Sequence, residues 1–80
     1  MNVMTFKKAL DVKAIDIVDA WIATNTDTEV AIILNNRGKY ELWMAETLIT
    51  KTLHGIFETF DAAVRKAECI FDVTVPASGD

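Results

Sequence analysis

The hydrophobic residues near the N-terminus repeat with the spacing of a helix. The signal is strongest over residues 9–23. On a helical wheel that also includes the preceding Phe6 and Lys8, one arc gathers Phe6, Leu10, Ala14, Ile15, Ile17, Val18, Trp21 and Ile22, and the opposite arc gathers Lys8, Ala9, Val12, Lys13, Asp16, Asp19 and Ala20. An arc of this width is typical of an amphipathic helix that faces a core. The competing interpretation is a strand through residues 14–18, which alternate only in part. We predict the helix, ended by the polar residues 24–27.

The middle of the chain has the pattern of a β-hairpin. Residues 29–34 and 39–45 are rich in β-branched and aromatic side chains, and Asn36-Arg37-Gly38 suits a three-residue turn that glycine closes in the left-handed conformation. The predicted register pairs Leu34 with Tyr40, Ile32 with Leu42 and Val30 with Met44, which form one apolar face. The other face holds Ala31, Ile33 and Trp43 beside Lys39 and Glu41, so it is apolar in part. We therefore expect both faces of the hairpin to be packed against other protein surface.

Residues 46–57 do not specify one conformation. Their threonines and Ile49 favour a third strand, but no turn residue separates them from the hairpin. A bent continuation of the strand, a loop and a helical segment remain alternatives. Gly55 is expected to end the segment.

The last element is a predicted helix from Thr59, as N-cap, to about Phe71. Asp61 lies in its first turn, where the helix dipole favours an acid. The apolar arc of this helix contains Phe60, Ala63, Val64, Ala67, Ile70 and Phe71. The fold class is therefore α+β in the order α-β-β-(β)-α, as one domain over residues 1–80, with residues 73–80 as a frayed tail.

Composition excludes several classes of protein. Hydrophobic residues make up 51% of the 80, which argues against a disordered chain. The net charge of −4 argues against a surface that binds nucleic acid directly. Cys69 is the one cysteine, so no intramolecular disulfide forms. No stretch has the character of a signal peptide or a membrane span, and we expect a cytoplasmic protein.

The sequence contains no recognisable catalytic motif. Phosphate-binding, dinucleotide, zinc-protease and nucleophile-elbow motifs are all missing from it. His54 and Cys69 are candidates for a catalytic pair, but nothing in the sequence converges on them. One histidine and one cysteine do not complete a zinc site. We therefore expect no enzyme activity, no cofactor and no metal.

Acidic and aromatic residues are the candidates for binding a partner. Residues 9–35 carry a net charge of −4, with Asp16, Asp19, Asp27 and Glu29 among their acids. They form either an acidic patch for a basic partner or a solvated face that keeps the protein soluble. Trp43 is either packed against Trp21 or part of an interface with Ala31 and Ile33. The predicted contact residues are Asp16, Asp19, Asp27, Glu29, Tyr40 and Trp43.

The segments GKYELWMAE and GIFETFDAAVRKAECIFD give the chain a resemblance to small accessory proteins. The hairpin followed by a Thr-capped helix resembles HicB-type antitoxins over about half of the chain. In size, acidity and architecture the chain also resembles small phage and mobile-element inhibitors of the anti-CRISPR type. That second resemblance implies a non-catalytic, phage-encoded inhibitor that masks a basic nucleic-acid-binding surface of a host complex. From the two partly apolar faces of the hairpin we also expect a homodimer. An antitoxin or immunity partner and a small structural or regulatory subunit are the alternatives.

Overall fold

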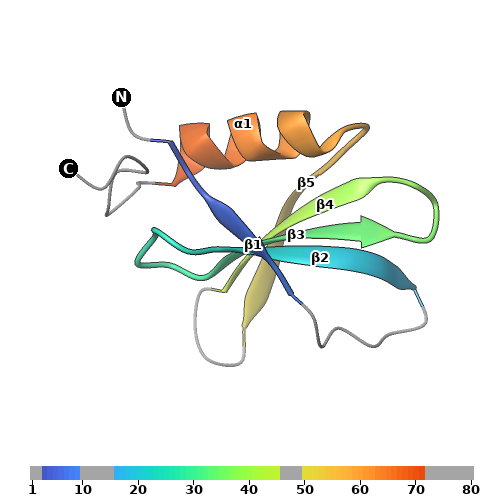
Figure 1. Ribbon diagram of the computed structural model, residues 1–80, viewed down its shortest axis with the longest axis horizontal. Helices are drawn as coiled ribbons and strands as arrows, with labels where there is room; N and C mark the ends of the chain where they lie inside the picture. Colours follow the sequence, from blue (N-terminus) through green and yellow to red (C-terminus); the bar gives the residue numbers. More distant parts are fainter. Residues whose placement is uncertain (1–2, 10–15, 46–49, 72–80) are drawn as a thin grey trace.

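A computed structural model of the chain describes residues 3–9, 16–45 and 50–71. The described residues form a five-stranded antiparallel sheet in which each strand pairs with the next one along the chain. One helix follows the last strand (Figure 1). The elements are β1 (Phe6–Lys8), β2 (Ile17–Ala23), β3 (Val30–Asn35), β4 (Tyr40–Ala45), β5 (Lys51–Phe57) and α1 (Phe60–Ile70).

The prediction of an N-terminal helix over residues 9–23 is wrong. Ile17–Ala23 is strand β2, which pairs with both β1 and β3. The first part of the predicted helix, residues 10–15, lies outside the described residues. Trp21 and Ile22 shared one arc of the helical wheel, but in the strand they point to opposite faces of the sheet. The α-β-β-(β)-α order is therefore replaced by five strands and a C-terminal helix.

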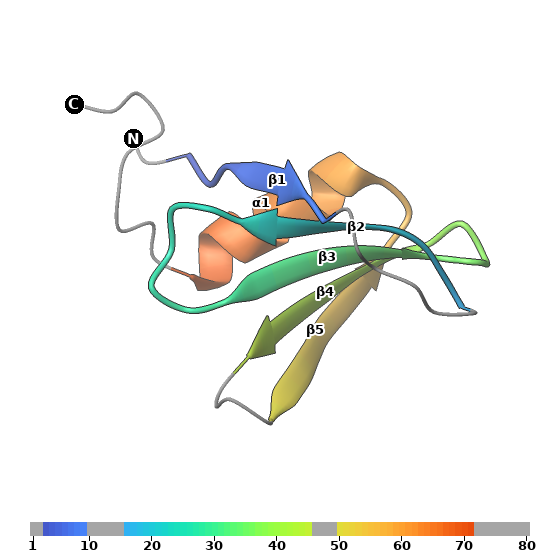
Figure 2. The ribbon, with the colours of Figure 1, turned by 60° about the horizontal axis from the view of Figure 1, so that its bottom comes forward.

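Helix α1 covers one face of the sheet. Figures 1 and 2 show it along one side of the strands, and no other described helix lies on the opposite side. The core between the helix and the sheet consists of Met4, Val30, Ile32, Leu42, Ala63 and Ala67, with Phe6, Trp21, Tyr40, Phe57 and Phe60 among the side chains packed around it. Alternation along the strands then leaves every second side chain on the uncovered face.

The predicted β3–β4 hairpin is confirmed together with its register. Val30 lies opposite Met44, Ile32 opposite Leu42 and Leu34 opposite Tyr40. The turn closes through the Gly38 amide, which donates to the Asn35 carbonyl at 3.1 Å. Gly38 has a φ of 79°, the left-handed conformation that the sequence predicted for it.

Replacing Gly38 with alanine is expected to lower the free energy of unfolding by about 1 kcal/mol, because a Cβ is unfavourable at positive φ. A Cβ at this position would meet no atom within 4 Å, so any loss comes from the backbone alone. Gly38→Asn is the matched control, since asparagine tolerates this conformation better. Urea denaturation measures both variants, and an alanine variant as stable as the wild type would contradict the prediction.

The undecided segment 46–57 contributes strand β5. Residues 46–49 lie outside the described residues, and Lys51–Phe57 pairs with β4. The prediction that Gly55 ends the segment is wrong, because Gly55 lies inside β5 opposite Leu42. A Cβ on Gly55 would lie 2.8 Å from the Phe57 ring, so the glycine makes room for that ring. A register shift beside Leu42 and Trp43 adds one residue to β5.

The C-terminal helix forms as predicted. The Thr59 hydroxyl accepts a hydrogen bond from the Ala62 amide at 3.1 Å, which makes Thr59 the N-cap. Ala63 and Ala67 are buried against the sheet, and Phe60, Val64 and Phe71 pack around them. Ile70 belongs to the same predicted apolar arc but is 40% exposed. The predicted tail, residues 73–80, lies outside the described residues.

Candidate partner-binding surface

The side of the sheet away from α1 is largely apolar. Register and alternation place on it the side chains of Ile22, Ala31, Ile33, Trp43, Leu53 and Ile56, which we call the helix-free face. Leu53 is 41% exposed and Ile56 is 56% exposed, although both are large aliphatic residues. A soluble monomer seldom keeps neighbouring apolar side chains on one face of a sheet without a partner to cover them.

Trp43 is held in place on the helix-free face. Its indole Nε1 donates to Glu41 Oε1 at 3.0 Å. The other oxygen of Glu41 accepts from Asn35 Nδ2 at 2.7 Å. Both oxygens of the carboxylate are therefore occupied, and the indole is fixed before any partner binds. A large aromatic side chain that is already fixed loses little conformational entropy on binding.

Trp21 does not cover Trp43. The Trp21 ring lies on the helix side of the sheet, 4.8 Å from the Phe60 ring and 6.0 Å from the Tyr40 ring, measured between centroids. The interpretation that the two tryptophans bury each other is wrong. Trp43 instead lies between Ala31 and Leu53, its partners on the neighbouring strands.

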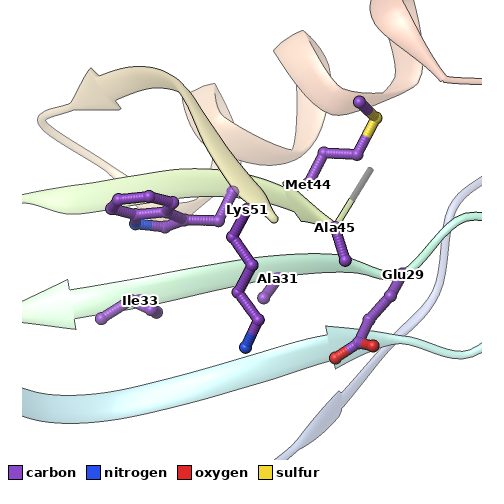
Figure 3. Close-up of a pocket in the computed structure, with 7 residues that line it drawn as sticks. Glu29, Ala31, Ile33, Met44, Ala45 and Lys51 are labelled. Carbon is purple, nitrogen blue, oxygen red and sulfur yellow. The ribbon is translucent and has the colours of Figure 1, made fainter. Parts of the chain in front are cut away.

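A shallow apolar hollow opens beside Trp43. It measures about 230 Å³, and its lining comes from β3, β4, β5 and the residue before β3: Glu29, Ala31, Ile33, Trp43, Met44, Ala45 and Lys51. Figure 3 shows Ala31 and Ile33 on β3 and Met44 turned toward the helix. Small-molecule sites usually enclose about 300–1,000 Å³, so this hollow suits a single side chain of a protein partner better than a cofactor.

The predicted acidic residues do not form one patch. Asp19 forms an ion pair with Lys8 at 3.0 Å, and Asp16 accepts a hydrogen bond from Asn36 beside the β3–β4 turn. Asp27 and Glu29 lie in the connection between β2 and β3, and both are exposed. Eight of the twelve acids and seven of the eight basic residues of the chain are described, so the described part is close to neutral.

Tyr40 lies on the opposite face from Trp43. Its ring contacts Trp21 and Phe60 under helix α1, with centroid distances of 6.0 Å to each. Tyr40 therefore belongs to the packing around the core. Of the two aromatic residues predicted to contact a partner, the structure places only Trp43 on the helix-free face.

Three residues of β5 were missed from sequence. Leu53 and Ile56 supply exposed apolar surface, and Lys51 lines the hollow. All three lie in the segment whose conformation the sequence left open. Lys51, Leu53 and Ile56 are the exposed residues of β5, and half-buried residues lie between them. The extra residue in β5 interrupts this alternation, so a period of two is not visible in the sequence.

His54 and Cys69 do not form a catalytic pair in the structure. His54 lies edge-on to the Phe71 ring at 5.3 Å, and its Nε2 is buried without a hydrogen-bond partner. Cys69 is exposed on α1, and no hydrogen bond joins it to His54. Within residues 3–9, 16–45 and 50–71 there is also no cluster of three or more residues suited to hold a metal ion.

Comparisons with known proteins add no relative. No family model, curated protein or solved structure matches the chain. Among the described residues no helix has the length and apolar character needed to cross a membrane, and α1 has eleven residues. Among the described residues, the helix-free face with Trp43 fixed on it is thus the candidate functional surface.

Proposed function

We propose that this chain is a non-catalytic protein-binding protein that contacts its target through the helix-free face. The observation that carries the proposal is the exposed apolar surface around Trp43, whose indole is fixed by Glu41. Tryptophan is among the residues most enriched at the energetic centres of protein interfaces. The hollow beside it is of a size to take one side chain of the target.

The proposed target is a basic, nucleic-acid-handling complex of a host cell, which the protein inhibits in the cytoplasm by masking a surface that binds nucleic acid. The net charge of −4 supports a basic target. Two exposed acids are candidates for the rim of this face: Glu29, which lines the hollow, and Asp27, two residues before it. Asp19 is already paired with Lys8 and contributes less.

Affinity capture tests this proposal. Tagged protein is incubated with extracts of cells that carry nucleic-acid-targeting defence systems, at low and at moderate salt, and bound proteins are identified by mass spectrometry. We expect an effector subunit with a basic surface, and less of it as salt rises. Capture of one small basic protein instead would indicate an antitoxin, and no bound protein at either salt would contradict the proposal.

Neutralising the acids near the helix-free face is expected to weaken capture. The double variant Asp27→Asn with Glu29→Gln should lower affinity for the target about two- to fivefold and flatten its salt dependence, because charges at the rim of an interface contribute modestly. The matched control is Asp61→Asn with Glu58→Gln, which removes the same charge at the start of α1. Equal effects of the two double variants on binding would contradict a role for this acidic rim.

A further inference from the structure

The two edge strands of the sheet differ in how open they are to pairing with a further strand. Strand β1 has three residues, two of them exposed lysines, and both its short length and its charge hinder pairing along that edge. Strand β5 has seven residues and contains no acid, lysine or arginine after Lys51. No described strand lies beyond it, and Figure 2 shows it at the outside of the sheet. Strand β5 is therefore the edge that is open to another strand.

The backbone groups of three β5 residues are directed away from β4. The Ala45 amide donates to the Glu29 carbonyl, so Ala45 bonds toward β3, and Lys51, which lies opposite it, directs its own N–H and C=O outward. Alternation, continued past the extra residue of the bulge, gives the same orientation to Leu53 and Ile56. The free edge of β5 thus presents donors and acceptors at defined positions.

We propose that a second copy of this chain adds its own β5 to this edge, antiparallel to the first and about a twofold axis perpendicular to the sheet. The register that aligns the outward groups pairs Leu53 with Ile56 of the other copy, and Ile56 with its Leu53. Each pair exchanges N–H···O=C bonds in both directions. Both copies carry the same extra residue between these two positions, so both pairs form at once.

The side chains are complementary to themselves in the same register. Leu53 and Ile56 are exposed aliphatic residues on the helix-free face, and each lies beside the other across the junction as a cross-strand pair. Lys51 comes opposite Glu58 of the other copy, so residues of opposite charge meet at both ends. Glu58 already pairs with Lys39, but its side chain is 78% exposed and accessible to a second cation. Figure 3 shows the Lys51 side chain beside the hollow, where no described residue forms an ion pair with it, so it is free to turn to the edge.

The two copies fit together without collision. Helix α1 packs over β3, β4 and β5, so it is centred on β4. The two β4 strands of the dimer lie three strand spacings apart, about 14 Å. Packed helices approach to about 8–10 Å, so both α1 helices have room on the same side of the joined sheet. The perpendicular axis keeps both helix-free faces on the other side, where the dimer presents Trp43 twice. The dimer goes beyond the proposed function and leaves the face open to the target.

Sedimentation equilibrium tests the dimer, and amide hydrogen exchange followed by NMR tests its edge. One strand from each copy makes a small contact, so we expect a dissociation constant in the micromolar range. The Leu53 and Ile56 amides should exchange about tenfold more slowly well above that concentration than below it. The Lys8 amide is the internal control. It is directed outward from β1, since the adjacent Ala9 amide bonds to Ala20, and it should exchange equally fast at both concentrations.

Charge reversal tests the register. Lys51→Glu alone or Glu58→Lys alone places like charges together at both ends of the junction, and each should raise the dissociation constant about fivefold or more. The double variant Lys51→Glu with Glu58→Lys should return it to within about threefold of the wild type, because opposite charges meet again. Lys66→Glu, on the exposed side of α1, makes the same change of charge elsewhere and should leave the dimer unchanged.

A wild-type chain that stays monomeric up to millimolar concentration would overturn the proposal. A dimer in which the Leu53 and Ile56 amides exchange as fast as in the monomer would overturn the β5 edge. Single variants without effect, or a double variant that is not restored, would overturn the register. Circular dichroism of each variant verifies that the chain is folded. No target is present in these samples, so a failure here leaves the proposed function untouched, and a failed capture leaves the dimer untouched.

Discussion

Replacing Trp43 with lysine is expected to abolish capture of the target while the chain stays folded. Truncation of a central aromatic residue in an interface costs about 2–4 kcal/mol, equivalent to about 30-fold or more in affinity. A lysine adds the cost of placing an ammonium group against the apolar surface around Ala31 and Leu53. The fold should survive, because Trp43 lies outside the core under α1. Quantitative capture, with circular dichroism alongside it, measures both effects.

The control for this variant is Ile70→Lys. Ile70 is 40% exposed and lies on α1, on the other side of the sheet, so it offers the same kind of substitution away from the helix-free face. We expect Ile70→Lys to bind as the wild type does. Binding by Trp43→Lys as strong as that of the wild type would contradict the assignment of the binding surface to this face. Loss of binding by Ile70→Lys alone would contradict it as well.

Replacing Leu42 with alanine is expected to destabilise the protein severely. Leu42 is fully buried at the centre of β4, and shortening a buried leucine costs about 2–5 kcal/mol. A domain of 80 residues has a total stability of about 4–12 kcal/mol, so the variant loses a large part of it. Urea denaturation should show a transition at much lower denaturant concentration, or a chain unfolded already in water.

Ile56→Ala is the matched control for this loss. Ile56 is 56% exposed on the neighbouring strand, so removing its side chain takes little surface away from the core. We expect a change in the free energy of unfolding below about 1 kcal/mol. A loss as large as that of Leu42→Ala would mean that the helix-free face is already covered within the chain, which would contradict its use as a binding surface.

The hairpin and the C-terminal helix were predictable because local signals specify each of them. The glycine at position 38 sets the turn, and the turn sets the register of β3 and β4. Thr59 and the spacing of Ala63 and Ala67 define the start and the buried side of α1. These elements need no knowledge of their neighbours.

The N-terminal strands could not be predicted in the same way. A strand with one apolar face alternates, but β2 carries Trp21 toward the helix and Ile22 toward the helix-free face, so its pattern lacks a period of two. The resulting run of apolar residues fits a helical wheel by chance. Pairing with β3 decides the strand, and such pairing depends on residues distant in sequence.

The candidate surface was predictable only in part. Trp43 with Ala31 and Ile33 was one of the two alternatives drawn from the hairpin, and the structure supports it by placing Trp21 elsewhere. The sequence predicted Asp16 and Asp19 on one polar face of a helix. This prediction is wrong because the N-terminal helix does not form. Tyr40 and Trp43 are three positions apart, an odd offset, so one regular strand cannot present both on one face.

Hydroxyl-radical footprinting tests the central claim, use of the helix-free face for binding, most directly. The wild-type chain is oxidised alone and when bound to its captured target, and modification is quantified by mass spectrometry. We predict that oxidation of Trp43, Leu53 and Ile56 falls on binding, while Cys69 and Ile70 on α1 are modified as before. Protection confined to α1, or no protection of Trp43 in the bound sample, would contradict the claim.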